Sequence, residues 1–262
     1  MPTQVTLVSV YGEKNKDLAV TIAQWQELVA KAVGSAFTPY DMHQIHATII
    51  GCERHRAPAY NANFSKHRGR EVEMDFAGFL AYLRGCGHIP FEVQLGGFAD
   101  RDYPFTSRKA RPYERAFSIQ GDKVVVMGWP VRGEPLPAPP ATPAGGVLEA
   151  RIYPATLDII RHAAQAFGIL HSYHRAVTDV DNDLFFRIGL IDTKAVTSAK
   201  TSALEGQTRK LLSMQRPVVV EIGLENIFVT AYEDDRLPVS STRTWALADR
   251  KVDGEFAASL FT

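Results

Sequence analysis

The sequence predicts an α+β fold of two pseudo-duplicated α/β lobes, with mainly antiparallel sheets flanking a central groove. Short β-rich runs are mixed with segments of helical periodicity, in the order β-α-β-α-β-β and then α-β-α-β-β. A proline-rich connector separates the two series. We therefore expect a single bilobal domain, with lobe 1 at about 1–129, the connector at 130–146 and lobe 2 at about 147–262.

The first lobe is predicted to alternate strands and helices, with two polar loops. Its longest helix has apolar residues at three- and four-residue spacing, an expected N-cap at Asp17 and a terminating glycine, Gly34. In chain order we expect a strand at 5–10, this helix at 17–33, a strand at 44–51, a polar and basic loop at 52–70, a helix at 75–84, a strand at 91–95, a second polar loop at 96–112, and hairpin strands at 116–120 and 123–127.

The second lobe repeats this order loosely, without a clear residue-level repeat. We expect a helix at 155–167 that ends at Gly168, a strand at 183–191, a helix at 197–214, and strands at 217–222 and 227–232. The remaining tail gives no firm pattern. The proposed duplication therefore depends on the order of the elements alone.

Composition limits the classes of partner. Apolar residues make up 45% of the 262 residues, enough for a sizeable core, and the net charge is zero. A neutral chain argues against broad duplex DNA binding, which needs a clustered positive face, but a small phosphate-bearing ligand needs only a few local donors. There is no signal-like N-terminus and no long apolar run, so we expect a cytoplasmic protein without a membrane partner. Cys52 and Cys86 are expected to be reduced thiols.

Two polar residues lie on the predicted buried strand at 44–51. His46 and Thr48 are two residues apart, so on a strand both side chains point to the same face. An imidazole beside a hydroxyl can transfer a proton and hold an anionic oxygen. The alternative is a core histidine and a strand threonine, each with ordinary hydrogen bonds.

The run 46–49, His-Ala-Thr-Ile, resembles the His-x-Thr/Ser-apolar motif of the two-histidine (2H) phosphoesterases, the superfamily of 2′,3′-cyclic phosphodiesterases and RNA-ligase-like enzymes. The segment 90–98 and the strand at 227–232 are similar to later parts of such proteins. The resemblance covers most of the chain and is specific only at the first motif. It implies His46 as acid/base and Thr48 as a donor to phosphate oxygens.

The second motif departs from the family pattern. On the strand at 183–191, Arg187 stands at the position of the second histidine and Gly189 at that of the second Thr/Ser. Arginine does not deprotonate near neutral pH, so it cannot replace an acid/base histidine, but it can clamp a phosphate bidentately. We therefore expect Arg187 in substrate binding.

Other residues are candidates for the missing roles. His171 and His174 precede the second strand and are possible proton partners, and Tyr232 on the last strand is a possible substrate-binding residue. We expect no metal and no other cofactor. A metal site of His43, His46 and Glu53 is an alternative, although it matches no familiar ligand spacing.

These features favour a hydrolase, a 2H-like phosphodiesterase that acts on a cyclic phosphate or phosphodiester of a nucleotide or short RNA end. One alternative is a catalytically degenerate protein that binds a nucleotide or RNA end without cleaving it. Another is a structural or interaction protein in which His46 and Thr48 are core residues. Turnover of a cyclic nucleotide separates the first of these from the other two.

Overall fold

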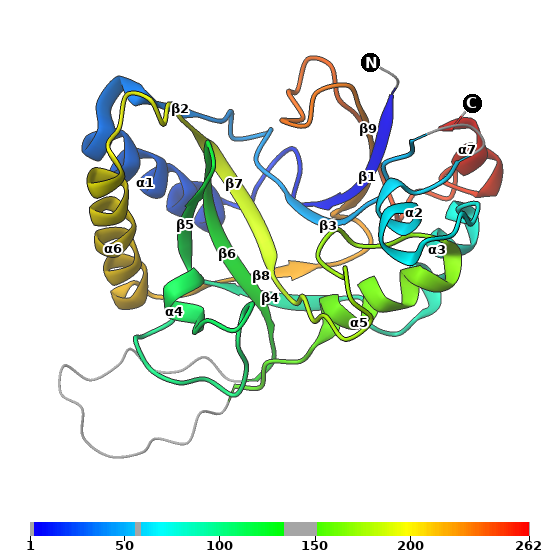
Figure 1. Cartoon of the computed structure of the whole chain (residues 1–262), viewed down its shortest axis with the longest axis horizontal. Helices are drawn as coiled ribbons and strands as arrows, with labels where there is room; N and C mark the ends of the chain where they lie inside the picture. The colour runs from blue at the N-terminus through cyan, green and yellow to red at the C-terminus, as the bar shows by residue number, and fades with distance from the viewer. Residues whose placement is uncertain (1–2, 56–58, 134–150, 262) are drawn as a thin grey trace.

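The computed structural model describes residues 3–55, 59–133 and 151–261, which form an α+β fold around a mainly antiparallel sheet (Figure 1). Ten strands connect in the order β10-β9-β1-β3-β7-β6-β4-β8, with β2 added to β7 and β5 added to β6. The predicted α+β class is therefore confirmed. The finer division into two duplicated lobes stays a prediction.

The strands and helices have the following bounds. The strands are β1 Gln4–Ser9, β2 Phe37–Pro39, β3 Ala47–Gly51, β4 Phe91–Leu95, β5 Phe117–Gln120, β6 Lys123–Val131, β7 Leu184–Ile191, β8 Val218–Ile222, β9 Ile227–Tyr232 and β10 Arg243–Ala246. The α-helices are α1 Lys16–Val33, α2 Ala62–Arg68, α3 Phe76–Gly85, α4 Pro112–Arg115, α5 Thr156–Ala163, α6 Ser198–Met214 and α7 Gly254–Ser259. Two 3₁₀ helices complete the set, η1 Gly34–Ala36 and η2 Ala164–Phe167.

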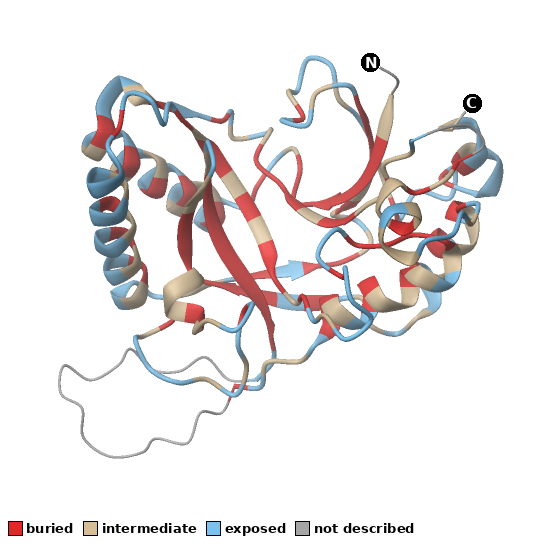
Figure 2. Ribbon diagram, in the orientation of Figure 1, coloured by how far each residue is buried: buried red, intermediate tan, exposed pale blue. Residues whose placement is uncertain are grey.

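One apolar core covers one face of the sheet. Helices α1, α3, α5 and α6 each bury apolar side chains in it, for example Trp25, Phe79 and Ile160, together with alternate residues of β1, β3, β6 and β7. The other face carries two smaller clusters, one around Val8 and one around Trp129. Figure 2 shows the outer faces of α1 and α6 exposed, while the strands between the helices are mostly buried. The face that carries the two smaller clusters is not covered by the main core, so polar side chains on it can contact a ligand.

The sheet narrows to a single residue pair at its centre. Strand β3 pairs with β7 at one position, Ala47 with Phe186, whereas β7 pairs with β6 at six positions. Past Ala47 the two strands separate, and β3 loses its neighbour on that side. The carbonyl groups of β3 beyond this point need other partners, because unpaired buried backbone groups are costly.

The buried side chain of Arg161, on α5, supplies those partners. Its Nε donates to the Ile49 carbonyl at 2.8 Å and its Nη2 to the Thr48 carbonyl at 3.1 Å. Its Nη1 donates to the Asp181 carbonyl at 2.9 Å and lies 3.4 Å from Asp181 Oδ1. Both charged side chains are only 2% exposed. Arg161 therefore fixes β3 and the segment that leads into β7 to the same helix.

Two predicted boundaries in the first lobe are corrected. Asn15 caps α1, not Asp17, because its side chain accepts a hydrogen bond from the Leu18 N–H at 2.9 Å. The strand expected at 44–51 begins only at Ala47, because the N–H groups of residues 44 and 45 both donate to the Asp41 carbonyl and close a turn there. His46 therefore lies immediately before β3.

Several short helices and strands were not predicted from the sequence. The polar loop expected at 52–70 contains α2, which Asn61 caps and which buries a single apolar side chain, Phe64. The connection after α1 contains β2, and the unassigned tail contains β10 and α7. These elements are short and carry too few apolar residues to show a period. The helix at 155–167 is confirmed as α5 plus η2, and Gly168 ends it with a left-handed φ of 72°.

The predicted connector at 130–146 begins too early. Strand β6 continues through Val131, and its Pro130 and Val131 pair with β4. Residues 134–146 of that prediction lie outside the described residues. Within the described ranges, no helix combines the length and apolar character needed to cross a membrane.

Candidate functional site

The single contact between β3 and β7 brings His46 and Arg187 together. Ala47 pairs with Phe186, and both side chains belong to the main core. Because side chains alternate along a strand, the adjacent residues, His46 and Arg187, point to the opposite face at neighbouring positions. Consistent with this register, the charge of Arg187 contributes to the lowered pKa of His46. The sequence alignment that placed Arg187 opposite His46 therefore agrees with the register of the sheet.

His46 is held in one orientation by its surroundings. Its Nδ1–H donates to the Gln44 carbonyl at 2.7 Å, which leaves the Nε2 lone pair available. The side chain is 6% exposed, and the Tyr11 ring lies 6.1 Å away between centroids. Burial lowers the pKa of His46 to about 4, against the opposing Gln44 hydrogen bond, and the charges of Arg187 and Lys14 lower it further. At neutral pH the ring is uncharged and can accept a proton.

Lys14 is a site residue that the sequence patterns did not reveal. It is 9% exposed, and its Nζ donates to the Gly12 carbonyl at 2.7 Å and to the His43 carbonyl at 3.5 Å. Burial lowers its pKa to about 7, against the opposing charge of Asp41. In the described part of the chain its ammonium has no ion-pair partner. A buried, unpaired lysine near a histidine can give up a proton near neutral pH.

Arg187 adds a second positive charge. Its Nη1 donates to the Tyr40 hydroxyl at 3.4 Å and to the Asp235 carbonyl at 3.2 Å, and lies 3.6 Å from the exposed Asp235 carboxylate. None of the hydrogen bonds between described residues uses its Nε or Nη2, so these donors remain for an anion. We call Tyr11, Lys14, Tyr40, His46 and Arg187 the His46 cluster.

Thr48 and Tyr232 have different surroundings. Thr48 is half-buried and pairs with Val8, whose side chain packs on the face opposite the main core. Thr48 therefore shares the face of His46, as predicted from the two-residue spacing. The Tyr232 hydroxyl donates to Glu53 Oε1 at 2.9 Å, so its predicted contact with substrate has no support from its hydrogen bonding.

His171 and His174 belong to a separate cluster. His171 Nε2 lies 3.1 Å from Asp181 Oδ2, and His174 Nε2 lies 3.0 Å from Asp158 Oδ1. No hydrogen bond or ring contact between described residues joins either histidine to His46. Their role as proton partners stays a prediction, and Lys14 is the group that the structure brings into the electrostatic environment of His46.

The packing of β2 against β7 explains why position 189 is a glycine. A Cβ at this position would lie 2.4 Å from the Phe37 ring and 2.6 Å from the Thr38 carbonyl oxygen, because β2 packs directly against β7 there. A threonine or serine does not fit without moving β2. Position 189 therefore cannot carry a hydroxyl side chain in this packing, whereas Thr48 offers one on β3.

The alternative metal site of His43, His46 and Glu53 is not assembled. His43 lies beside Asp41, with 3.4 Å between Nδ1 and Oδ1, and Glu53 accepts the Tyr232 hydroxyl. Among the described residues, the group whose ligand atoms are close enough for one ion is Asp158, His162 and His174. This group was not predicted. Its signal in the sequence is a carboxylate and a histidine four residues apart on a helix.

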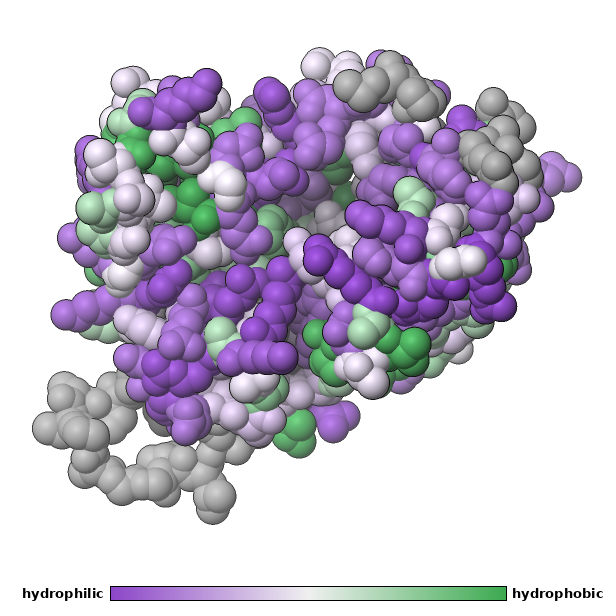
Figure 3. Space-filling view, viewed as in Figure 1, coloured by the Kyte–Doolittle hydropathy of each residue, from purple (hydrophilic) through white to green (hydrophobic). Residues whose placement is uncertain are grey.

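Comparison with protein-family models, with curated proteins and with solved structures finds no match. The interpretation of the site therefore depends on its own geometry and charge. Figure 3 shows a hollow on the side of the molecule that is seen in Figure 1, with mostly hydrophilic side chains around it. A small polar ligand suits such a surface better than an apolar one.

Proposed function

We propose that the protein is a phosphoesterase that hydrolyses a cyclic phosphate or phosphodiester of a nucleotide or RNA end at the His46 cluster. One observation carries the proposal: His46 and Arg187 occupy neighbouring positions across the β3–β7 contact, within the electrostatic influence of Lys14. A neutral imidazole near cationic side chains is suited to activating water beside a bound phosphate. The resemblance to 2H phosphoesterases gives the same class of reaction.

His46 acts as the general base in this proposal. Its Nδ1–H is held by the Gln44 carbonyl, so Nε2 takes the proton from a water molecule whose oxygen attacks phosphorus. The low pKa of about 4 keeps Nε2 unprotonated over most of the pH range. It also makes His46 a weak base, so the reaction depends strongly on charge stabilisation by neighbouring groups.

Arg187 and Thr48 hold the phosphate oxygens. The Nε and Nη2 donors of Arg187 match two oxygens of one phosphate, and the guanidinium stays charged at every relevant pH. Thr48 shares the face of His46 and offers one hydroxyl donor. Together they stabilise the additional negative charge that develops as water attacks.

Lys14 supplies the second proton transfer. As the bond between phosphorus and the leaving ribose oxygen breaks, the Lys14 ammonium donates a proton to that oxygen. The products are a phosphomonoester and a free hydroxyl, and the proton taken by His46 returns through solvent to restore both groups. A pKa of about 7 makes Lys14 a better proton donor than an ordinary lysine.

We expect a bell-shaped dependence of kcat/KM on pH for a 2′,3′-cyclic nucleotide. His46 must be unprotonated, so activity falls as pH decreases through about 4. Lys14 must be protonated, so activity falls as pH increases through about 7. Steady-state rates in constant-ionic-strength buffers, with stability followed in parallel, measure both limbs.

Replacing Lys14 with methionine should remove the alkaline limb and lower the plateau rate by about 10²-fold or more, because the leaving group then departs without its acid. The exposed Lys16, two residues away, provides the control K16M, which should keep the parent profile. An alkaline limb that persists in folded K14M would assign that limb to another group and contradict this role.

A degenerate phosphate-binding protein is the second candidate, and the Arg187 and Gly189 positions favour it. Arginine binds phosphate but cannot exchange protons, and the packing of β2 leaves no room for a second hydroxyl. This alternative predicts stoichiometric binding of a cyclic nucleotide with no product. Multiple turnover by the pure protein excludes it.

Both candidates require Arg187, so its replacement tests the site itself. We expect R187K to weaken binding of the cyclic nucleotide by about 10-fold or more, because lysine keeps the charge but loses the planar pair of donors. Ligand-induced thermal stabilisation and calorimetric affinity measure this loss. Arg236 is exposed on the neighbouring loop, and R236K serves as the control. Equal affinity of R187K and the parent would remove Arg187 from the site.

A further inference from the structure

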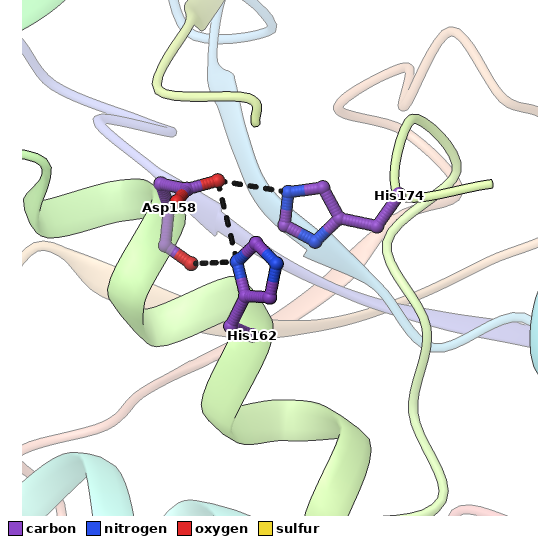
Figure 4. Close-up of side chains that lie close together, drawn as sticks. All are labelled: Asp158, His162 and His174. Atoms are coloured by element: carbon purple, nitrogen blue, oxygen red, sulfur yellow. Dashed lines mark hydrogen bonds and ion pairs between the residues drawn. The ribbon is translucent and has the colours of Figure 1, made fainter. Parts of the chain in front are cut away.

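A second cluster of metal-ligating side chains lies outside the His46 cluster. Asp158 and His162 are four residues apart on α5, so they share one face of the helix, and His174 approaches from the segment between η2 and β7. One ligand atom from each of the three lies within 4.8 Å of the others. Figure 4 shows both imidazole rings directed toward the Asp158 carboxylate.

The distances suit a single ion. His174 Nε2 lies 3.0 Å from Asp158 Oδ1, and His162 Nδ1 lies 3.3 Å from the same oxygen. Bonds of about 2.0–2.2 Å at tetrahedral angles place neighbouring ligand atoms about 3.4 Å apart. These two distances are close to the spacing that a bound ion imposes. The ion would replace the contact of 3.0 Å between His162 Nδ1 and the Asp158 carbonyl oxygen.

The two rings are buried to different degrees. The His174 side chain is 0% exposed, and its Nδ1 has no hydrogen-bond partner among the described residues. The Nε2–H of His174 donates to the Asp158 carboxylate, so coordination of an ion by Nε2 requires the ring proton to move to Nδ1. The His162 side chain is 36% exposed, so this side of the cluster is open to water and to an entering ion.

Hydrogen bonds from neighbouring residues orient the Asp158 carboxylate, and nearby arginines set the charge around the cluster. The Asp181 N–H donates to Asp158 Oδ1 at 2.8 Å, an outer hydrogen bond of the kind that positions metal ligands. No hydrogen bond between described residues uses Asp158 Oδ2. Two nearby arginines oppose a bound cation: Arg161, whose charge is already paired with the buried carboxylate of Asp181, and Arg68, which donates to the His174 carbonyl at 2.9 Å.

We propose that Asp158, His162 and His174 form a binding site for a divalent transition-metal ion of the zinc type, with a further coordination position open to water. Two imidazoles and one carboxylate suit Zn²⁺ and its first-row neighbours, whereas Mg²⁺ and Ca²⁺ prefer oxygen ligands throughout. The ion joins α5 to the segment that leads into β7. It thereby stabilises the same segment through which Asp181 holds Arg161.

The test uses the full chain after treatment with a chelator and buffer exchange. Calorimetric titration with ZnCl₂ should give one equivalent per chain, and Zn²⁺ should raise the thermal midpoint. Titration with Co²⁺ should give visible absorption bands typical of a low-symmetry site with nitrogen ligands. Because His162 is partly exposed on a helix, H162A is expected to fold and to bind Zn²⁺ at least about 100-fold more weakly.

The matched control is H55A. His55 has nearly the same exposure, 35%, and lies 3.4 Å from the carboxylate of Glu71, but among the described residues no second histidine completes a group there. It should leave Zn²⁺ affinity unchanged. Equal affinity of H162A and the parent would overturn the proposal, as would the absence of any binding at millimolar Zn²⁺, which would leave a hydrogen-bonded cluster only.

Discussion

Replacing His46 with alanine is expected to lower kcat for a 2′,3′-cyclic nucleotide by about 10²–10⁴-fold, the contribution typical of a positioned general base. The reason is that Nε2 is the proton acceptor that the structure presents beside Arg187, with Nδ1 committed to the Gln44 carbonyl. Initial rates at saturating substrate measure the loss. Ligand affinity should change much less, because Arg187 and Lys14 remain.

Two further variants make this result decisive. In H46N the side-chain amide can still donate toward the Gln44 carbonyl but has no base, so the folded structure is retained and the rate should fall as in H46A. In H43A an exposed histidine three residues earlier is removed, and the rate should not change. Parent-like turnover by a folded H46N protein would contradict the role of His46.

Replacing Arg161 with methionine is expected to lower the free energy of unfolding by about 3–5 kcal/mol, the summed cost of leaving three buried carbonyl groups without a donor. Methionine fills similar space but leaves the carbonyls of Thr48, Ile49 and Asp181 without the donors of Arg161. The Asp181 carboxylate keeps His171 and Arg108 as partners and loses one of its cations. Urea denaturation followed by circular dichroism measures the difference. Turnover should also fall, because β3 carries Thr48 and directly follows His46.

Arg209 provides the comparison for this variant. Its Nε donates to the Phe117 carbonyl at 2.9 Å, and its Nη2 lies 3.1 Å from Glu205 Oε2, but the side chain is 23% exposed. Water can replace these contacts, so R209M should cost about 1 kcal/mol or less. Equal losses for R161M and R209M would show that Arg161 does not hold the centre of the sheet.

Hydrophobic periodicity predicted well the elements that bury a regular apolar face. The helix α1 and the strands β4 and β9 were located closely from their spacing alone. The short elements were missed for a physical reason. Helix α2 buries one apolar side chain, Phe64, so tertiary contacts and its Asn61 cap stabilise it without a visible period.

In the candidate site too, some features were predictable from the sequence and others were not. The two-residue spacing of His46 and Thr48 was enough to predict one shared face, because strand alternation is local. The neighbourhood of Lys14 was not predictable, since the long-range pairing of β1 with β3 places its loop beside the residues before β3. Likewise, His174 joins Asp158 and His162 through a fold of the segment after η2 that no sequence period records.

The phosphoesterase proposal is tested most directly by ³¹P NMR of a 2′,3′-cyclic nucleotide incubated with the pure protein at a catalytic amount. The account predicts that the cyclic phosphate resonance is replaced by that of one phosphomonoester over many turnovers, and that H46N leaves it in place. A resonance that neither converts nor broadens, even at stoichiometric protein, would contradict both phosphate hydrolysis and phosphate binding at the His46 cluster.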